Sequence, residues 1–181
     1  INSQPNSVIE QRLYEDIIRE YGNIAYRPGD TLAYTFTSGN QVFDIGSPVD
    51  LVNVLSSHNY PVEGSVEAAI NRAMSYLTPD LQNNKQVQVI LIGSYINNTS
   101  VNTGSNIPLH VFHAHSGTRS QYESNFRGLA TGQFLSLQSM DDQLRTFLTT
   151  LNSSRMVYDL SYSSRTAQEG IRSVTVTAQV N

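Results

Sequence analysis

Three histidines lie within six residues of one another and form the first group in this sequence that could do chemistry. They are His110, His113 and His115, and His58 lies earlier in the chain. Because side chains alternate along a strand, His113 and His115 would face the same side of one. Three imidazoles can bind zinc, although this spacing matches no zinc-binding template. We therefore expect no metal: His110 is packed, and His113 and His115 are solvated or act as capping groups.

Ser94 stands at the end of an apolar stretch, where a strand would present it as a nucleophile. His113 or His115 could then serve as its base. The surrounding sequence Gly-Ser-Tyr-Ile is not a Gly-x-Ser-x-Gly elbow, however, and no acid is obviously placed to orient the histidine. The glycine-rich motifs that bind nucleotides are absent from the sequence as well. We expect the chain not to be an enzyme and to use no cofactor, so a serine hydrolase ranks third among its possible functions.

The composition argues against several partners. The net charge is −4 and Lys85 is the only lysine, whereas nucleic-acid binding requires clustered cations. No stretch approaches the ~20 apolar residues of a membrane span, so we expect no membrane insertion by this chain. Cysteine is absent, which excludes disulfides and thiolate metal sites. A low lysine content combined with many Asn, Ser and Thr residues favours an extracellular or cell-surface location.

Apolar residues at helical spacing predict five helices. We expect them to begin at or just after Ser7, Ser47, Gly64, Ser120 and Ser139. Ser7 with Glu10, and Ser120 with Glu123, have the spacing of a capping box. Gly22 can end the first helix in a left-handed conformation.

Strand patterns alternate with these helices. Residues 31–37 and 41–45 alternate in polarity around a Ser-Gly-Asn turn, which predicts an antiparallel pair. Residues 87–92 and 107–114 are nearly all apolar, which is typical of parallel strands covered by helices on both faces. A further short strand is expected at 133–137. The sequence therefore predicts an α/β fold with a mostly parallel, doubly wound sheet, flanked by helices and carrying one antiparallel edge strand.

The period changes after the last helix. Residues 157–162 and 173–180 alternate like antiparallel strands and are joined by a polar loop through Gly170. We expect residues 1–154 to form the α/β domain. Residues 155–181 are expected to form a C-terminal β extension, either a hairpin packed on that domain or a strand swapped into it.

The order of these elements resembles that of a von Willebrand factor A domain over about residues 2–151. Residues 30–36 (DTLAYTF) resemble the second strand of that family, and residues 63–70 (EGSVEAAI) resemble the start of a helix that follows it. Residues 89–92 (VILI) resemble the strand that carries a metal-site Asp at its end. Residues 155–180 are similar to segments that follow such domains in large bacterial surface proteins.

The family's metal-ion-dependent adhesion site is degenerate in this chain. Such sites use an Asp-x-Ser-x-Ser motif after the first strand, a Thr before a helical Gly, and an Asp after the fourth strand. Here Pro61 stands at the Thr position and Ser94 at the Asp position, and Ser3 is near the end of what remains of the first motif. Hard cations require several oxygen ligands, usually including carboxylates. The resemblance therefore implies a domain that does not depend on a bound metal.

In this fold class, ligands bind at the carboxyl ends of the strands. The binding residues expected there are Ser3, Tyr60, Glu63, Ser94, Tyr95 and His115. The resemblance implies an extracellular protein-interaction or adhesion module that binds a protein or glycan ligand at a cell surface. The alternative is a structural subunit or spacer domain of a cell-envelope or filament assembly.

The family's first strand, which lies in the middle of its sheet, is not ahead of the first helix in this sequence. An empty gap would leave backbone groups unpaired, at about 1–3 kcal/mol for each buried group. A strand must therefore fill it. One candidate is residues 174–180 (VTVTAQV), which have strong β propensity and could come from this chain or from a second copy in a homo-oligomer formed by strand exchange. The other candidate is a separate peptide outside this sequence.

Overall fold

The computed structural model describes residues 8–57, 64–96 and 106–154 of the 181-residue chain. Five of the residues discussed above lie outside the described ranges: Ser3, His58, Tyr60, Pro61 and Glu63. The expected β extension at residues 155–181 and the N-cap Ser7 also lie outside them.

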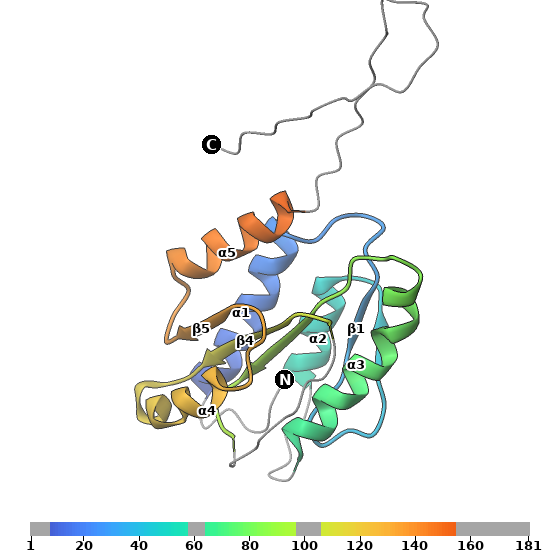
Figure 1. The fold of residues 1–181 in the computed structure, drawn as a ribbon. Coiled ribbons are helices and arrows are strands. Elements are labelled where there is room, and N and C mark those ends of the chain that lie inside the picture. The colour runs from blue at the N-terminus through green and yellow to red at the C-terminus, as the bar shows by residue number, and fades with distance from the viewer. Residues whose placement is uncertain (1–7, 58–63, 97–105, 155–181) are drawn as a thin grey trace, which may run out of the picture.

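The described elements alternate between helices and strands (Figure 1). The first half of the chain contains α1 (Val8–Ile24), β1 (Leu32–Tyr34), β2 (Phe43–Ile45), α2 (Pro48–Ser57) and α3 (Val66–Gln82). The second half contains β3 (Val89–Gly93), β4 (Leu109–Ala114), the 3-10 helix η1 (Gly117–Tyr122), α4 (Glu123–Arg127), β5 (Phe134–Leu137) and α5 (Asp142–Ser153).

Strands β3, β4 and β5 form a parallel sheet with β4 in its centre. Helices cover both of its faces, and Figure 1 shows α1 and α3 on opposite sides of the strands. Side chains from α1, α2 and α5 form one core with Ile92 and Phe112. Side chains from α3 and α4 form a second core with Leu91 and Val111. The alternation of residues 91 and 92, and of 111 and 112, between the two cores confirms a sheet buried on both faces.

Strands β1 and β2 form a separate antiparallel pair, in which Leu32 is opposite Ile45 and Tyr34 is opposite Phe43. The α/β class, the parallel sheet and the antiparallel pair are as the sequence predicts. The described residues form two sheets rather than one continuous sheet, however, because β1 makes no ladder with β3.

Two expected helix boundaries are wrong. Helix α1 continues past Gly22 to Ile24. A Cβ on Gly22 would lie 3.0 Å from the Cβ of Pro48, so this glycine allows α2 to approach α1 rather than ending the helix. Helix α5 has Asp141 as its N-cap in place of Ser139, because the Asp141 carboxylate accepts a 3.0 Å hydrogen bond from the backbone N–H of Leu144.

The expected capping box at Ser120 is also wrong. Ser120 lies inside the 3-10 helix η1, and Tyr122 is the N-cap of α4 without a side-chain cap bond. The carboxylate of Glu123 accepts instead from Arg127 and from Ser136 on the neighbouring strand. These bonds hold α4 against the end of the sheet.

Candidate functional site

The carboxyl ends of β3, β4 and β5 lie side by side and carry polar residues that are buried. Ser94 follows β3, His113 and His115 lie at the end of β4, and Ser136 lies near the end of β5. The exposed fractions are 0% for Ser94, 0% for His113, 1% for His115 and 0% for Glu10, which joins them from the first turn of α1. Burial of so many polar groups requires partners for them.

His113 lies in a stack of three rings. Its centroid is 4.2 Å from that of His115 and 4.7 Å from that of Phe126 on α4. Burial, together with His115, lowers the pKa of His113 to about 4, although the carboxylates of Glu123 and Glu10 favour its charged form. The Ser94 backbone also favours protonation, but it approaches the ring without the geometry of a hydrogen bond. His113 is therefore a neutral imidazole at pH 7.

His115 connects the neighbouring elements through both of its ring nitrogens. Its Nδ1 donates to the carbonyl oxygen of Ser116 at 2.9 Å, and its Nε2 lies 3.2 Å from Ser136 Oγ on β5. Ser116 in turn donates from its backbone N–H and its hydroxyl to Glu10 Oε1, at 2.9 and 2.8 Å. The network therefore ties the start of α1 to the ends of β4 and β5.

The same network continues outward to the surface. Ser136 Oγ donates to Glu123 Oε2 at 3.2 Å, and Arg127 donates to Glu123 Oε1 at 2.7 Å. The Arg127 hydrogen bond and the Ser136 hydrogen bond lower the pKa of Glu123. Arg127 also lies over the ring of Phe134, 4.3 Å from its centroid. The exposed end of the network is thus an ion pair on a short helix.

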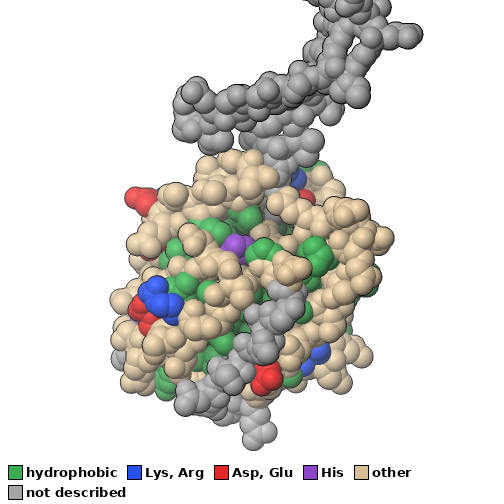
Figure 2. Space-filling view, viewed as in Figure 1, with side chains coloured by type: hydrophobic (Ala, Val, Ile, Leu, Met, Phe, Trp, Pro, Cys, Tyr) green, Lys and Arg blue, Asp and Glu red, His purple; other side chains and the backbone are tan. Residues whose placement is uncertain are grey.

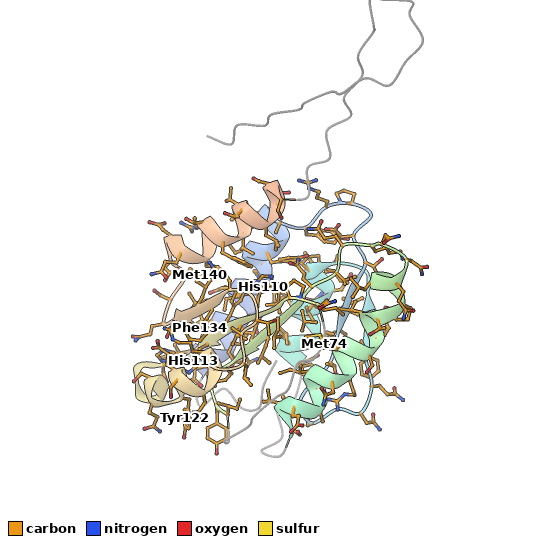
Figure 3. The ribbon with its side chains drawn as sticks, viewed as in Figure 1. Met74, His110, His113, Tyr122, Phe134 and Met140 are labelled. Carbon is orange, nitrogen blue, oxygen red and sulfur yellow. The ribbon has the colours of Figure 1, made fainter. Side chains whose placement is uncertain are left out.

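A pair of tyrosines lies at the same end of the sheet. Tyr95 follows Ser94, and its ring packs edge-to-face on Tyr122 with the centroids 4.9 Å apart. Figure 3 shows Tyr122 near His113 on the side covered by α4. Both tyrosines are half-buried. Half-buried tyrosines are suited to contact surfaces, because the ring buries area and the hydroxyl still reaches a partner.

His110 lies apart from this group and packs toward α5. Its ring is 4.9 Å from that of Phe147, and its Nδ1 accepts from the backbone N–H of Gln133 at 3.0 Å. Burial lowers its pKa. His110 is packed as expected. His113 and His115 were expected to be solvated or to act as capping groups, and the solvated alternative is wrong because both are buried. Both lie on a central strand whose two faces are covered by helices, so neither face is open to water.

Three of the expected binding residues are described, and the structure brings Ser94, Tyr95 and His115 together at one edge of the sheet. Ser3, Tyr60 and Glu63 lie outside the described residues. Glu10, Tyr122, Glu123 and Ser136 also belong to this group and were not expected there from the sequence. Glu10 had a usable signal, because it occupies the apolar face of α1 with Leu13, Tyr14 and Ile17. A carboxylate at such a position requires a buried partner.

The described residues do not supply the ligand set of the cation site found in the family that the sequence resembles. Ser94 supplies no charge, and no three His, Asp or Glu side chains within residues 8–57, 64–96 and 106–154 come together to hold a metal ion. Ser94 and His113 are both fully buried.

Comparisons of this chain with protein-family models, with curated proteins and with solved structures found no match. Within the described ranges, no helix has the length and apolar character needed to span a bilayer.

Proposed function

We propose that this chain is a non-catalytic binding module of the von Willebrand A type that acts without a bound metal at a cell surface. Its ligand is a protein or a glycan and not a nucleic acid, since the chain has a net charge of −4. The ligand contacts the carboxyl edge of the sheet. The observation that carries this proposal is the arrangement of that edge. Ser94, His113 and His115 are buried there, whereas Tyr95 and Tyr122 are partly accessible and are suited to contact with a ligand.

The buried network supports a positioning role rather than chemistry. Hydrogen bonds among Glu10, Ser116, His115 and Ser136 join α1, β4 and β5. A general base needs direct access to the proton that it removes. The network instead provides a rigid support for the side chains that lie outside it, namely Tyr95, Tyr122 and the Glu123–Arg127 ion pair.

The test is binding by the full chain to a glycan array and to a panel of immobilised extracellular-matrix proteins, all measured with a chelator present. We expect at least one probe to bind in the chelator. Tyr95→Ala and Tyr122→Ala should each weaken that binding at least tenfold. The matched control is Tyr76→Ala, which removes a tyrosine on α3 whose hydroxyl bonds Asp44 on β2. It should bind like the wild type.

Three outcomes contradict this proposal. Binding that disappears in the chelator would show that a metal is required. Equal loss in the Tyr76 variant would show that the carboxyl edge is not the contact surface. Hydrolysis of a generic ester that is abolished by Ser94→Ala would favour the hydrolase.

A second candidate function is a structural subunit of an envelope assembly or filament. One observation favours it: β1 and β3 are end strands of their sheets within the described part of the chain, so they offer edges to a strand from another copy. Light scattering after size exclusion distinguishes the two functions. A binding module elutes as a discrete species, whereas an assembly subunit shows a mass that increases with concentration.

A further inference from the structure

A groove of about 600 Å³ separates β1 from β3. One wall includes residues 29–35, which contain all of β1, and the other includes residues 85–92, which contain most of β3. Each of the two strands is the last of its sheet in the described part of the chain. The groove is therefore bordered on both sides by strand edges that pair with no other strand among the described residues.

The backbone of β3 shows which polar groups face the groove. The N–H of Val89 donates to the Pro108 carbonyl at 2.9 Å, on the side of β4. Backbone groups point to alternate sides along a strand, so Ile90 and Ile92 direct their N–H and C=O groups to the opposite side. Both residues line the groove. These groups are a template for one more strand.

Helices line the groove from both faces of the sheet, as they would cover a central strand. Ile17 and Ile18 of α1 line it, as do Ile70 and Ala73 of α3. These two helices lie on opposite faces of the sheet (Figure 1). Hydrophobic side chains are also exposed near the middle of the face drawn in Figure 2. An occupant therefore needs uncharged side chains on both of its faces and high β propensity.

Residues 174–180 (VTVTAQV) have the required length and carry no charge, with Val and Ala on one face and Thr and Gln on the other. Seven residues of strand extend about 23 Å, which matches the seven residues of the β1 wall. Four β-branched residues open the segment, and it contains no charge, proline or glycine. The other β-type stretch beyond α5, residues 157–162, contains Asp159. A carboxylate is costly in a strand that is covered on both faces.

The described chain also ends close to the groove. Arg27, which lines the groove, donates from Nε and Nη2 to Asn152 in the last turn of α5, at 2.7 Å each. Residues 155–173 then separate α5 from the segment. At about 3.3 Å per residue they can extend roughly 60 Å, which is more than twice the length of the groove. The segment can therefore reach the groove of its own chain.

We propose that residues 174–180 of this chain occupy the groove as a strand between β1 and β3, joining the two sheets into one. The segment binds through backbone hydrogen bonds to both edges, and its side chains contact α1 on one face and α3 on the other. Side chains alternate along a strand, so Val174, Val176, Ala178 and Val180 share one face.

The test compares two full-length variants that differ only in where proline is placed. Thr177→Pro removes a backbone donor from the middle of the proposed strand, a position where proline is not tolerated. Thr166→Pro places the same substitution in the connecting stretch. We expect Thr177→Pro to lower the melting temperature by roughly 10 °C, or to prevent folding, and Thr166→Pro to leave it unchanged. Equal melting temperatures for both variants and the wild type would overturn the proposal.

A synthetic peptide with the sequence SVTVTAQV tests the same groove directly. Added to the Thr177→Pro variant, or present during its refolding if the variant is unfolded, the peptide should restore the melting temperature in a saturable manner. A peptide of the same composition in scrambled order should not. Failure of the SVTVTAQV peptide to stabilise the variant would show that the groove does not accept this strand.

Light scattering of the wild-type chain identifies the source of the strand. A monomeric mass together with the proline result supports insertion within one chain. A dimer whose dissociation accompanies the loss of stability in Thr177→Pro would mean that the segment enters a second copy, and would overturn the assignment to the same chain.

Discussion

The guanidinium of Arg27 donates to both the side-chain oxygen and the backbone oxygen of Asn152, so that one arginine joins the loop before β1 to the last turn of α5. We expect Arg27→Met to lower the free energy of unfolding by about 2 kcal/mol, because hydrogen bonds from charged groups are worth ~1.5–3 kcal/mol. Urea denaturation followed by circular dichroism measures this change.

The matched control is Arg145→Met. Arg145 also connects α5 to the first half of the chain, through a 2.7 Å bond to Glu20, but its side chain is 56% exposed. Exposed ion pairs contribute little, so this variant should lose less stability than Arg27→Met. A larger loss in the Arg145 variant would contradict the role given to Arg27.

His113 makes stability depend on pH in a defined direction. Its pKa is about 4 in the folded chain against 6.5 in the unfolded chain. Between these values the unfolded chain binds a proton that the folded chain does not, so stability falls as pH is lowered from about 6.5 to about 4. The loss is at most about 3 kcal/mol. Unfolding free energies measured at closely spaced pH values should show this slope.

The variant His113→Phe should reduce that slope, because it keeps an aromatic ring against Phe126 and removes the titrating group. The control His110→Phe retains His113 and should retain most of the slope. A pH profile that is identical in His113→Phe and the wild type would assign the acid sensitivity to other groups.

Gly64 allows the start of α3 to approach the loop that follows β1. A Cβ at this position would lie 2.7 Å from the carbonyl carbon of Thr37, and Ser65 donates to the Thr37 carbonyl oxygen at 3.2 Å. We expect Gly64→Ala to cost about 1–3 kcal/mol, because backbone atoms must move to admit the methyl group. Thermal unfolding measures the loss. Gly117→Ala, whose Cβ would meet nothing closer than 3.9 Å, should be close to neutral.

Metal independence has a simple test. Magnesium or calcium at millimolar concentration should leave the melting temperature unchanged, because a ligand stabilises only a native state that binds it. An increase of several degrees would show that oxygen ligands rebuild a site around Ser94 with residues outside the described ranges.

Periodicity in the sequence was sufficient to predict the α/β class, the parallel strands and the antiparallel pair, because those patterns follow from which faces are buried. Sequence rules for helix ends and caps failed at positions where contacts with distant residues determine the structure. Gly22 has the sequence signal of a helix end, but its lack of a side chain serves the approach of Pro48. Glu123 has the spacing of a capping residue, but its carboxylate accepts from Arg127 and Ser136.

The candidate site was predictable in location and less so in composition. Ser94, Tyr95 and His115 follow from the rule that ligands bind at the carboxyl ends of parallel strands. The burial of His113 and His115 depends on α4 covering that edge, and α4 has only five residues with a weak sequence signal. Ser136 joins the network because β5 pairs in register with β4, and no pattern along the chain indicates that pairing.

Continuity of the sheet across the groove is tested most directly by amide hydrogen exchange at single residues of β3 in the full-length chain. The N–H groups of Val89 and Leu91 face β4, whereas those of Ile90 and Ile92 face the groove. If residues 174–180 occupy the groove, the amides of Ile90 and Ile92 should exchange as slowly as that of Leu91, and Thr177→Pro should accelerate them selectively. Rapid exchange at Ile90 and Ile92 beside a protected Leu91 in the wild-type chain would contradict the account.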